Sequence, residues 1–255
     1  MHDIHIHTSL SSCSSTDLSL YVPEIRKHKY AAVGFANHVW DSAVPGASDW
    51  YKPQDIAHVL KLREELGRYD FGETKVYLGC EAEYIGGGVV GLDPRNAPLF
   101  DYVLVSAHHF HMAGFTRPAD LTDLGEVRKL MLERFLEVCD IGFAFGVVHP
   151  FLPMGYMDSA LEILRGIKDE NFRACFRYAA ERKKSIEINL SVFRKFTEAE
   201  LSEYRRMMTI ARKCGCRFHI GSDAHTVESF NPEQIISGER FASDCGITLP
   251  EDPLA

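Results

Sequence analysis

The sequence lacks the features of a membrane-bound, secreted or nucleic-acid-binding chain. No apolar run approaches the roughly 18 residues of a membrane-spanning helix. The start, MHDIHIHTS, has neither the basic nor the apolar segment of a secretory signal. Basic clusters are also missing, since 28 Lys and Arg stand against 36 Asp and Glu, a net charge of -8. We therefore expect a cytoplasmic protein that does not bind membrane and has little affinity for long nucleic acid.

Disulfide bonds and multiple domains are not indicated either. The seven cysteines are an odd number, and without a signal segment they are expected to stay reduced. Hydrophobic residues at 45% and charged residues at 25% are ordinary for a globular protein. The length of 255 residues suits a single α/β barrel, which typically takes about 250 residues. We expect one domain over residues 1–255, and the composition does not indicate an oligomeric state.

Short apolar segments alternate with amphipathic ones along the whole chain. Strands are expected at residues 3–7, 32–37, 75–81, 102–106, 143–149, 185–189 and 217–221, and helices lie between them, for example at 124–139, 172–182 and 198–214. Thr197 with Glu200 three residues later predicts a capping box at the start of the last of these helices. Repeated strand–helix alternation predicts parallel strands joined by right-handed crossovers. The expected fold class is therefore an α/β, TIM-like barrel of about seven units.

Histidines and carboxylates stand at the ends of these predicted strands. His5 and His7 are two apart in a strand, so their imidazoles point to the same face. The carboxyl ends of parallel barrel strands meet in one crater, where such enzymes hold their active sites. Eight side chains there qualify as metal ligands: His5, His7, His38, Glu81, His108, His149, Asp223 and His225.

This set is larger than one ion requires. A zinc ion takes three or four protein ligands, so two or three divalent ions are indicated, and imidazoles with bridging carboxylates suit zinc, iron or manganese. A single histidine at a strand end is commonly structural. Eight unpaired groups in one crater would destabilise the folded protein, and a bound cation removes this cost. The pattern therefore favours a metal site.

The motifs in this order resemble the PHP (polymerase and histidinol phosphatase) family. The resemblance rests on Asp3-x-His5-x-His7-Thr8, Gly79-x-Glu81, His149-Pro150 and Gly221-Ser222-Asp223-Ala224-His225. It implies a distorted (β/α)7 barrel with a trinuclear site. One ion would be held by His5, His7, Glu81 and Asp223; a second by Glu81 as a bridge with His108 and His149; a third by His38 and His225.

Two ligand positions stay open. Many members of the family have a histidine in the loop after the first strand, where this chain has Cys13 in the segment SLSSCSSTD. Either Cys13 binds the ion, or water replaces the ligand, or the third ion is weakly bound, and we favour the last two because the loop is rich in serine. His109 replaces His108 as the ligand if the strand register slips by one residue.

The resemblance implies metal-dependent hydrolysis of a phosphate monoester by metal-activated hydroxide. Histidinol phosphate is the leading substrate, because Glu187-Ile188-Asn189 with Phe193-Arg194-Lys195 resembles a stretch of the histidinol-phosphatase branch. Another small phosphorylated metabolite is also possible. We expect His38, Asp223 and His225 to be catalytic as well as metal-binding, and Arg194 and Arg117 to bind phosphate, since a forked guanidinium suits its oxygens.

Two other functions are considered. An amidohydrolase-like hydrolase would also have paired histidines and a late aspartate, but usually has a bridging lysine at a strand end, and none of the predicted strands ends in lysine. A non-catalytic metal-binding module, as PHP domains are in some polymerases, is the other. The nearly full ligand set and the absence of a polymerase segment disfavour it.

Overall fold

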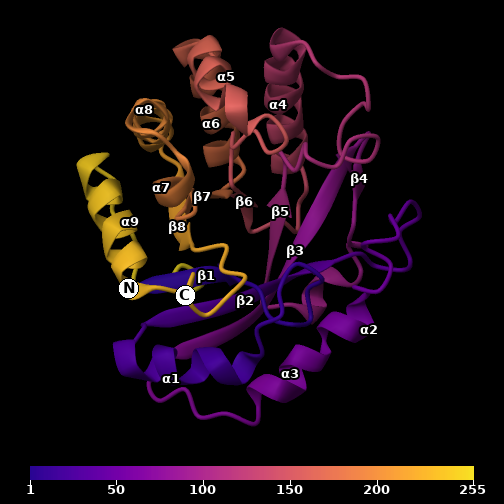
Figure 1. Cartoon of the computed structure of the whole chain (residues 1–255), viewed down its shortest axis with the longest axis vertical. Helices are drawn as coiled ribbons and strands as arrows, with labels where there is room; N and C mark the ends of the chain where they lie inside the picture. The colour runs from indigo at the N-terminus through magenta and orange to yellow at the C-terminus, as the bar shows by residue number, and fades with distance from the viewer.

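The computed structural model describes all 255 residues and shows a sheet rolled into a barrel (Figure 1). Seven strands run parallel in the order β1-β2-β3-β5-β6-β7-β8, and β4 pairs antiparallel with the end of β3. The strands are β1 (His2–Ile6), β2 (Ala32–Val39), β3 (Lys75–Gly86), β4 (Val89–Val90), β5 (Tyr102–Ser106), β6 (Gly146–Val148), β7 (Ser185–Asn189) and β8 (Arg217–Gly221).

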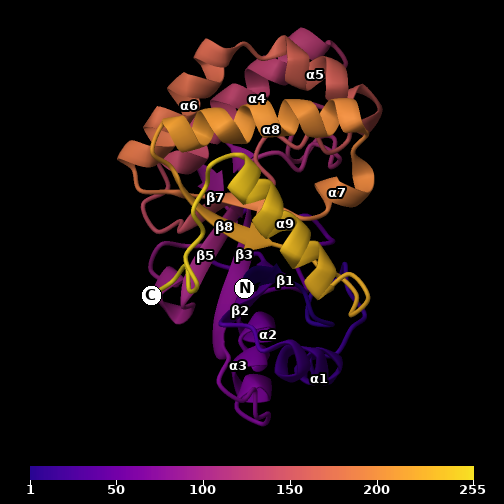
Figure 2. The same cartoon turned by 90° about the vertical axis from the view of Figure 1, so that its left-hand side faces the viewer.

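Helices surround this sheet on its outer side (Figures 1 and 2). α1, α2 and α3 lie below β1–β3 in Figure 1, while α4, α5 and α6 lie at the opposite end of the molecule. The helices are α1 (Leu18–His28), α2 (Ile56–Val59), α3 (Lys61–Leu66), α4 (Leu124–Cys139), α5 (Ala160–Gly166), α6 (Asp169–Glu181), α7 (Val192–Lys195), α8 (Glu198–Lys213) and α9 (Pro232–Asp244), with short 3-10 turns at Ala97–Leu99 and Met157–Ser159.

The barrel closes between its first and last strands at the carboxyl end. His7 N–H donates to the Ala224 carbonyl at 2.9 Å, and Asp223 N–H donates to the His5 carbonyl at 2.8 Å. On the first strand these bonds involve the end of β1 and the residue after it, and on the last strand they involve the segment just after β8, so they do not run along the full length of the two strands. The closure therefore places the GSDAH segment directly beside the HIH segment.

Two apolar clusters stabilise the barrel. The larger, of 59 buried residues, lies mainly between the sheet and the helices, and the smaller fills the barrel interior with Ile4, Ala36, Tyr102, Leu104 and Val148. The Tyr102 hydroxyl donates to the Ile4 carbonyl at 2.6 Å. Its ring occupies the space that a side chain on Gly34 or Gly79 would need, so small residues on β2 and β3 make room for the interior packing.

The expected α/β barrel is confirmed, with local differences. β3 extends to Gly86, and the following glycines at 86, 87 and 88 all have positive φ, which lets the chain turn back into β4. β6 is shorter than the strand expected at residues 143–149. The capping box is present, since Thr197 and Glu200 each accept a hydrogen bond from the other's backbone N–H.

None of the helices is both long and apolar enough to span a lipid bilayer.

Candidate metal centre

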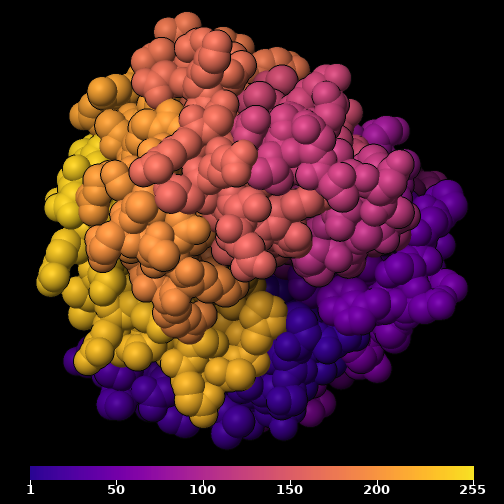
Figure 3. Space-filling model, turned by 45° about the horizontal axis from the view of Figure 1, so that its top comes forward, coloured from indigo at the N-terminus to yellow at the C-terminus, as the bar shows by residue number.

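The carboxyl ends of the strands surround a cavity of about 480 Å³. Figure 3 shows a hollow where segments from the start, middle and end of the chain meet. Its floor holds His38, Glu81, His109, Asp223 and His225. Cys13, Ser48, Trp50, Tyr51, His111, Met112, Phe115, Met154 and Lys195 complete the lining.

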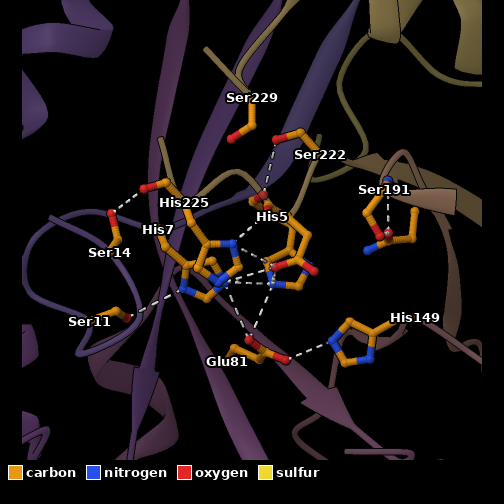
Figure 4. Close-up of polar contacts among 12 residues, drawn as sticks. His5, His7, Ser11, Ser14, Glu81, His149, Ser191, Ser222, His225 and Ser229 are labelled. Atoms are coloured by element: carbon orange, nitrogen blue, oxygen red, sulfur yellow. Dashed lines mark hydrogen bonds and ion pairs between the residues drawn. The ribbon is translucent and has the colours of Figure 1, made fainter. Parts of the chain in front are cut away.

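Glu81 stands at the centre of the polar cluster, and each of its two oxygens faces a different set of imidazoles (Figure 4). Its Oε2 lies 3.3 Å from His5 Nε2 and 3.5 Å from His7 Nε2. Asp223 Oδ1 lies 3.4 Å from His7 Nε2, and the two Nε2 atoms of His5 and His7 are 3.1 Å apart. Ligand atoms around one tetrahedral zinc are about 3.3 Å apart, so these four side chains fit one ion.

The other oxygen of Glu81 faces a second set. His149 Nε2 lies 3.0 Å from Glu81 Oε1, and His109 Nε2 lies 3.6 Å from the same oxygen. The three side chains are buried and their ligand atoms converge. Glu81 can therefore contribute one oxygen to each of two ions.

The structure places His108 outside this cluster, which corrects the sequence prediction. His108 Nε2–H donates to the Met131 carbonyl at 2.9 Å, and its Nδ1 accepts from Phe151 N–H at 2.9 Å. Both ring nitrogens are thus engaged by backbone groups. β5 ends at Ser106, and past that point the strand alternation no longer applies, so His109 faces Glu81 instead.

A third group lies beside the first. Ligand atoms of His7, Cys13, His38 and His225 all lie within 4.8 Å of one another. The rings of His7 and His225 are stacked with centroids 4.6 Å apart. His38 Nδ1 is 3.1 Å from Glu81 Oε2 but makes no hydrogen bond.

Buried carboxylates orient the imidazoles from behind. His5 Nδ1–H donates to Glu187 Oε1 at 2.6 Å, which turns Nε2 toward Glu81. His109 Nδ1–H donates to Glu83 Oε2 at 2.6 Å, and the Tyr51 hydroxyl donates to the same oxygen at 2.8 Å. Histidine ligands in metalloproteins commonly have such a partner, which fixes the ring and its tautomer. The sequence indicated Glu187 only as part of a motif and gave no sign of its role behind His5.

The charge states in the cluster suit a cation. Burial disfavours ionisation of Glu81, yet the imidazoles of His38 and His5 hold its pKa well below the usual value. Burial likewise disfavours ionisation of Asp223, but the hydrogen bond with His7 keeps the pKa of the Asp223 carboxyl below its usual value. Burial lowers the pKa of His7 to about 4 and lowers that of His38 strongly. Neutral imidazoles beside ionised carboxylates are the states that metal binding needs, and His7 and His38 are in that state. Burial acts to lower the pKa values of His5 and His109, but the carboxylates of Glu187 and Glu83 raise both above the usual value, so these two imidazoles would release a proton when an ion binds.

Two residues of the site have an unusual backbone conformation, which Lys29, Phe151 and Lys183 also adopt outside the set of candidate ligands. His149 has a φ of 33° and Asp223 a φ of 53°, in the left-handed region that non-glycine residues rarely adopt. Each such residue costs on the order of 1–3 kcal/mol, and such strain gathers at functional sites.

The residues present fit a set of divalent ions. The buried Nδ1 atoms of His38 and His149 have no hydrogen-bond partner, and the carboxylates and imidazoles form the mixed nitrogen and oxygen donor set that zinc, iron and manganese accept. Glu81 stands between the first two groups of donors.

The cationic residues at the cavity differ from those expected. Arg194 is exposed on α7 and does not line the cavity, whereas the adjacent Lys195 does. Arg117 is turned into its own loop, where its guanidinium donates to the Phe110 carbonyl at 2.5 Å and lies over the Tyr156 ring. Among the lining residues, Lys195 is the one lysine or arginine. In the sequence Lys195 stands next to Arg194, the residue that the family resemblance favours.

Comparison with known proteins places the fold. No family model and no curated protein matches the sequence significantly. Histidinol phosphate phosphatase from Lactococcus lactis, solved with zinc, L-histidinol and phosphate, is similar with a TM-score of 0.70, 18% identity, and coverage of 97% of this chain and 94% of that one. The chain has the fold of a histidinol phosphate phosphatase. A candidate histidinol phosphatase from Listeria monocytogenes is similar with a TM-score of 0.65 and 15% identity, over 91% of this chain and 97% of that one.

Proposed function

We propose that the protein is a metal-dependent phosphatase that hydrolyses a phosphate monoester. The observation that carries this proposal is the position of Glu81, whose Oε1 and Oε2 face separate sets of imidazoles at 3.0–3.6 Å. A carboxylate bridging two ions at the floor of an open cavity is typical of sites that clamp a phosphoryl group. The fold shared with a zinc-containing histidinol phosphate phosphatase supports the same reaction class.

The side chains have separate tasks. His5, His7, Glu81 and Asp223 would hold one ion, Glu81, His109 and His149 a second, and His38 and His225 would face the substrate side of a third. The bound ions would supply hydroxide near neutral pH and positive charge for the phosphoryl oxygens. Glu187 and Glu83 orient His5 and His109. Lys195, at the cavity rim, would bind the phosphate dianion and orient it.

Histidinol phosphate is the first substrate to test, because of the EIN and FRK stretches and the fold neighbour that binds L-histidinol and phosphate. The cavity wall favours a second candidate, a monoester of an uncharged aromatic alcohol. Trp50, Tyr51, Phe115, Met112 and Met154 line it. The lining carboxylates, Glu81 and Asp223, both belong to the metal cluster, so the wall offers no free carboxylate to pair with an ammonium group on the leaving alcohol.

A phosphate-release assay tests the function. Histidinol phosphate, an uncharged aryl phosphate and an alkyl phosphate are offered to protein loaded with zinc or manganese and to chelated protein. We expect turnover of at least one monoester that disappears on chelation and returns with metal. A loaded protein that is inactive on every monoester contradicts the proposal. Faster turnover of the aryl ester than of histidinol phosphate would favour the uncharged leaving group.

The two other functions have weaker support. None of the strands ends in the lysine that an amidohydrolase-like site would use. A purely structural metal module would not need a cavity of about 480 Å³ open above the metal ligands. Turnover of an amide or lactone in the same panel, without phosphatase activity, would favour the amidohydrolase-like alternative.

A further inference from the structure

The loop between β1 and α1, residues 7–17, carries Cys13 to the cavity and is held in place by hydrogen bonds. Ser11 Oγ accepts a hydrogen bond from His38 N–H at 2.8 Å. Ser14 Oγ donates to the His225 carbonyl at 2.7 Å (Figure 4). The serines, which suggested flexibility in the sequence, therefore tie Cys13 to the backbones of His38 and His225.

The side chains around Cys13 converge on one point. Ligand atoms of Cys13, His38, His225 and His7 lie within 4.8 Å of one another. His225 Nδ1–H donates to the Asp223 carbonyl at 2.8 Å, which leaves Nε2 with its lone pair. His38 is 6% exposed, and its buried Nδ1 has no hydrogen-bond partner. This nitrogen lies 3.1 Å from Glu81 Oε2 without a hydrogen bond, and a buried imidazole nitrogen left unpaired beside a carboxylate indicates a missing cation.

We propose that Cys13 is a thiolate ligand that, with His38 and His225, holds a third ion at the cavity, and that this ion is zinc. The proposal rests on the proposed function, since it completes the same metal centre. A thiolate is a soft ligand that selects zinc over manganese, whereas imidazole and carboxylate accept both. On binding, the Cys13 S–H bond breaks, a sulfur–zinc bond forms, and the proton leaves to solvent.

Other roles for Cys13 fit the structure less well. Burial, with the nearby Glu81 and Asp223 carboxylates, raises the pKa of its thiol to about 12, which disfavours a free thiolate nucleophile near neutral pH. All seven cysteines are free thiols, so Cys13 has no disulfide partner. A purely structural thiol would not need three imidazoles around it.

Cobalt substitution tests the sulfur bond directly. The full-length protein is chelated, loaded with Co²⁺ alone, and its absorption spectrum is recorded. We expect a thiolate-to-cobalt charge-transfer band in the wild type and in Cys214→Ser, whose half-buried thiol lies at the end of α8, away from the cavity. The band should be lost in Cys13→Ser and in Cys13→His. A wild type without the band, or a band that persists in Cys13→Ser, overturns the proposal.

Zinc titration provides the second readout. Cys13→Ser should lose about one zinc ion per chain or bind it roughly tenfold or more weakly, and Cys13→His should restore it, because a histidine replaces the ligand. In the wild type, zinc should protect Cys13 from alkylation, mapped by mass spectrometry, while Cys214 stays as reactive as in the chelated protein. Equal Cys13 labelling with and without zinc overturns the proposal even if the variants misfold.

The two proposals fail separately. If the wild type binds no transition ion, the proposed function fails. If it binds two ions and hydrolyses a monoester, but Cys13→Ser keeps the zinc content and the cobalt spectrum of the wild type, the phosphatase stands and the thiolate site is wrong.

Discussion

The Nδ1 atom of His5 lies 2.6 Å from Glu187 Oε1, and both side chains are fully buried. The other oxygen of Glu187 accepts from His149 N–H at 2.6 Å and from Asn189 Nδ2 at 3.0 Å. One carboxylate behind the cluster therefore positions a histidine of the first metal group and the backbone of a histidine of the second.

Glu187→Gln should weaken metal binding without removing a ligand. The amide keeps the size of the side chain but loses the negative charge that holds the His5 tautomer, so we expect affinity to fall about 10- to 100-fold. Competition with a chromophoric chelator measures this, and circular dichroism checks the fold. Glu81→Gln, which alters a ligand, should lose the metal more completely. Unchanged affinity in Glu187→Gln would show that the contact is structural only.

His109 and His108 should separate metal binding from stability. His109→Ala removes a ligand of the second group and should lose about one ion per chain and most activity. His108→Ala should keep the metal but unfold more easily, by about 2–5 kcal/mol, because the Met131 carbonyl and the Phe151 N–H lose their partners. Elemental analysis and urea unfolding measure the two effects. Metal loss in His108→Ala with full retention in His109→Ala would restore the original assignment.

Lys195 and Arg194 are adjacent but differ in position, so they form a matched pair. If Lys195 binds the phosphate, Lys195→Ala should lower kcat/KM about 10- to 100-fold, since a charge-assisted contact is worth roughly 1.5–3 kcal/mol. Metal content should not change, and inorganic phosphate should inhibit less. Arg194→Ala should alter kcat/KM by less than about threefold, because its side chain is exposed away from the cavity. The reverse ranking would contradict the assignment to Lys195.

Strand periodicity explains what could be predicted from the sequence. His5 and His7 were expected to converge because they are two apart in a strand, and their Nε2 atoms are 3.1 Å apart. His108 was misplaced because it lies two residues beyond the end of β5, where alternation no longer holds. Arg194 was preferred to Lys195 because the family resemblance favours the arginine. Consecutive residues of a helix point in directions about 100° apart, and the sequence does not show which of the two faces the cavity.

The attachment of the Cys13 loop to the barrel could not be predicted from the sequence either. Its hydrogen bonds join Ser11 to His38 and Ser14 to His225, residues that are 27 and 211 positions apart. A serine-rich segment with no fixed spacing to its partners looks flexible in a sequence, because local composition does not record contacts formed by barrel closure.

A buried histidine at the opposite end of β1 should make stability depend on pH. His2 is 2% exposed; its Nδ1–H donates to the Pro250 carbonyl at 2.9 Å, and its Nε2 accepts from Ile220 N–H at 2.9 Å. Burial lowers the pKa of His2 to about 4, although the hydrogen bond to the Pro250 carbonyl by itself raises this pKa. In the unfolded chain a histidine has a pKa of about 6.5.

Between pH 6.5 and pH 4 the unfolded chain therefore binds a proton at His2 that the folded protein does not. The free energy of unfolding consequently rises with pH in this window, and the contribution of His2 is lost as the pH falls, at about 1.4 kcal/mol per pH unit and about 3 kcal/mol in total. Replacing His2 with glutamine removes this titration. His2→Gln should be less stable than wild type at pH 7.5, through its hydrogen bonds, but should lose less stability on acidification.

Urea unfolding of wild type and His2→Gln at pH 7.5, 6, 5 and 4.5 measures the difference, and metal release at low pH affects both proteins and cancels. Tyr77→Phe is the matched control, since Tyr77 binds Asp252 in the same C-terminal segment at 2.7 Å but is no histidine. The Tyr77→Phe substitution should lower the free energy of unfolding by a similar amount at each of these pH values. Parallel curves for wild type and His2→Gln would mean that His2 takes up its proton as readily in the folded protein as in the unfolded chain, whereas curves that converge toward pH 4.5 would show that it stays neutral.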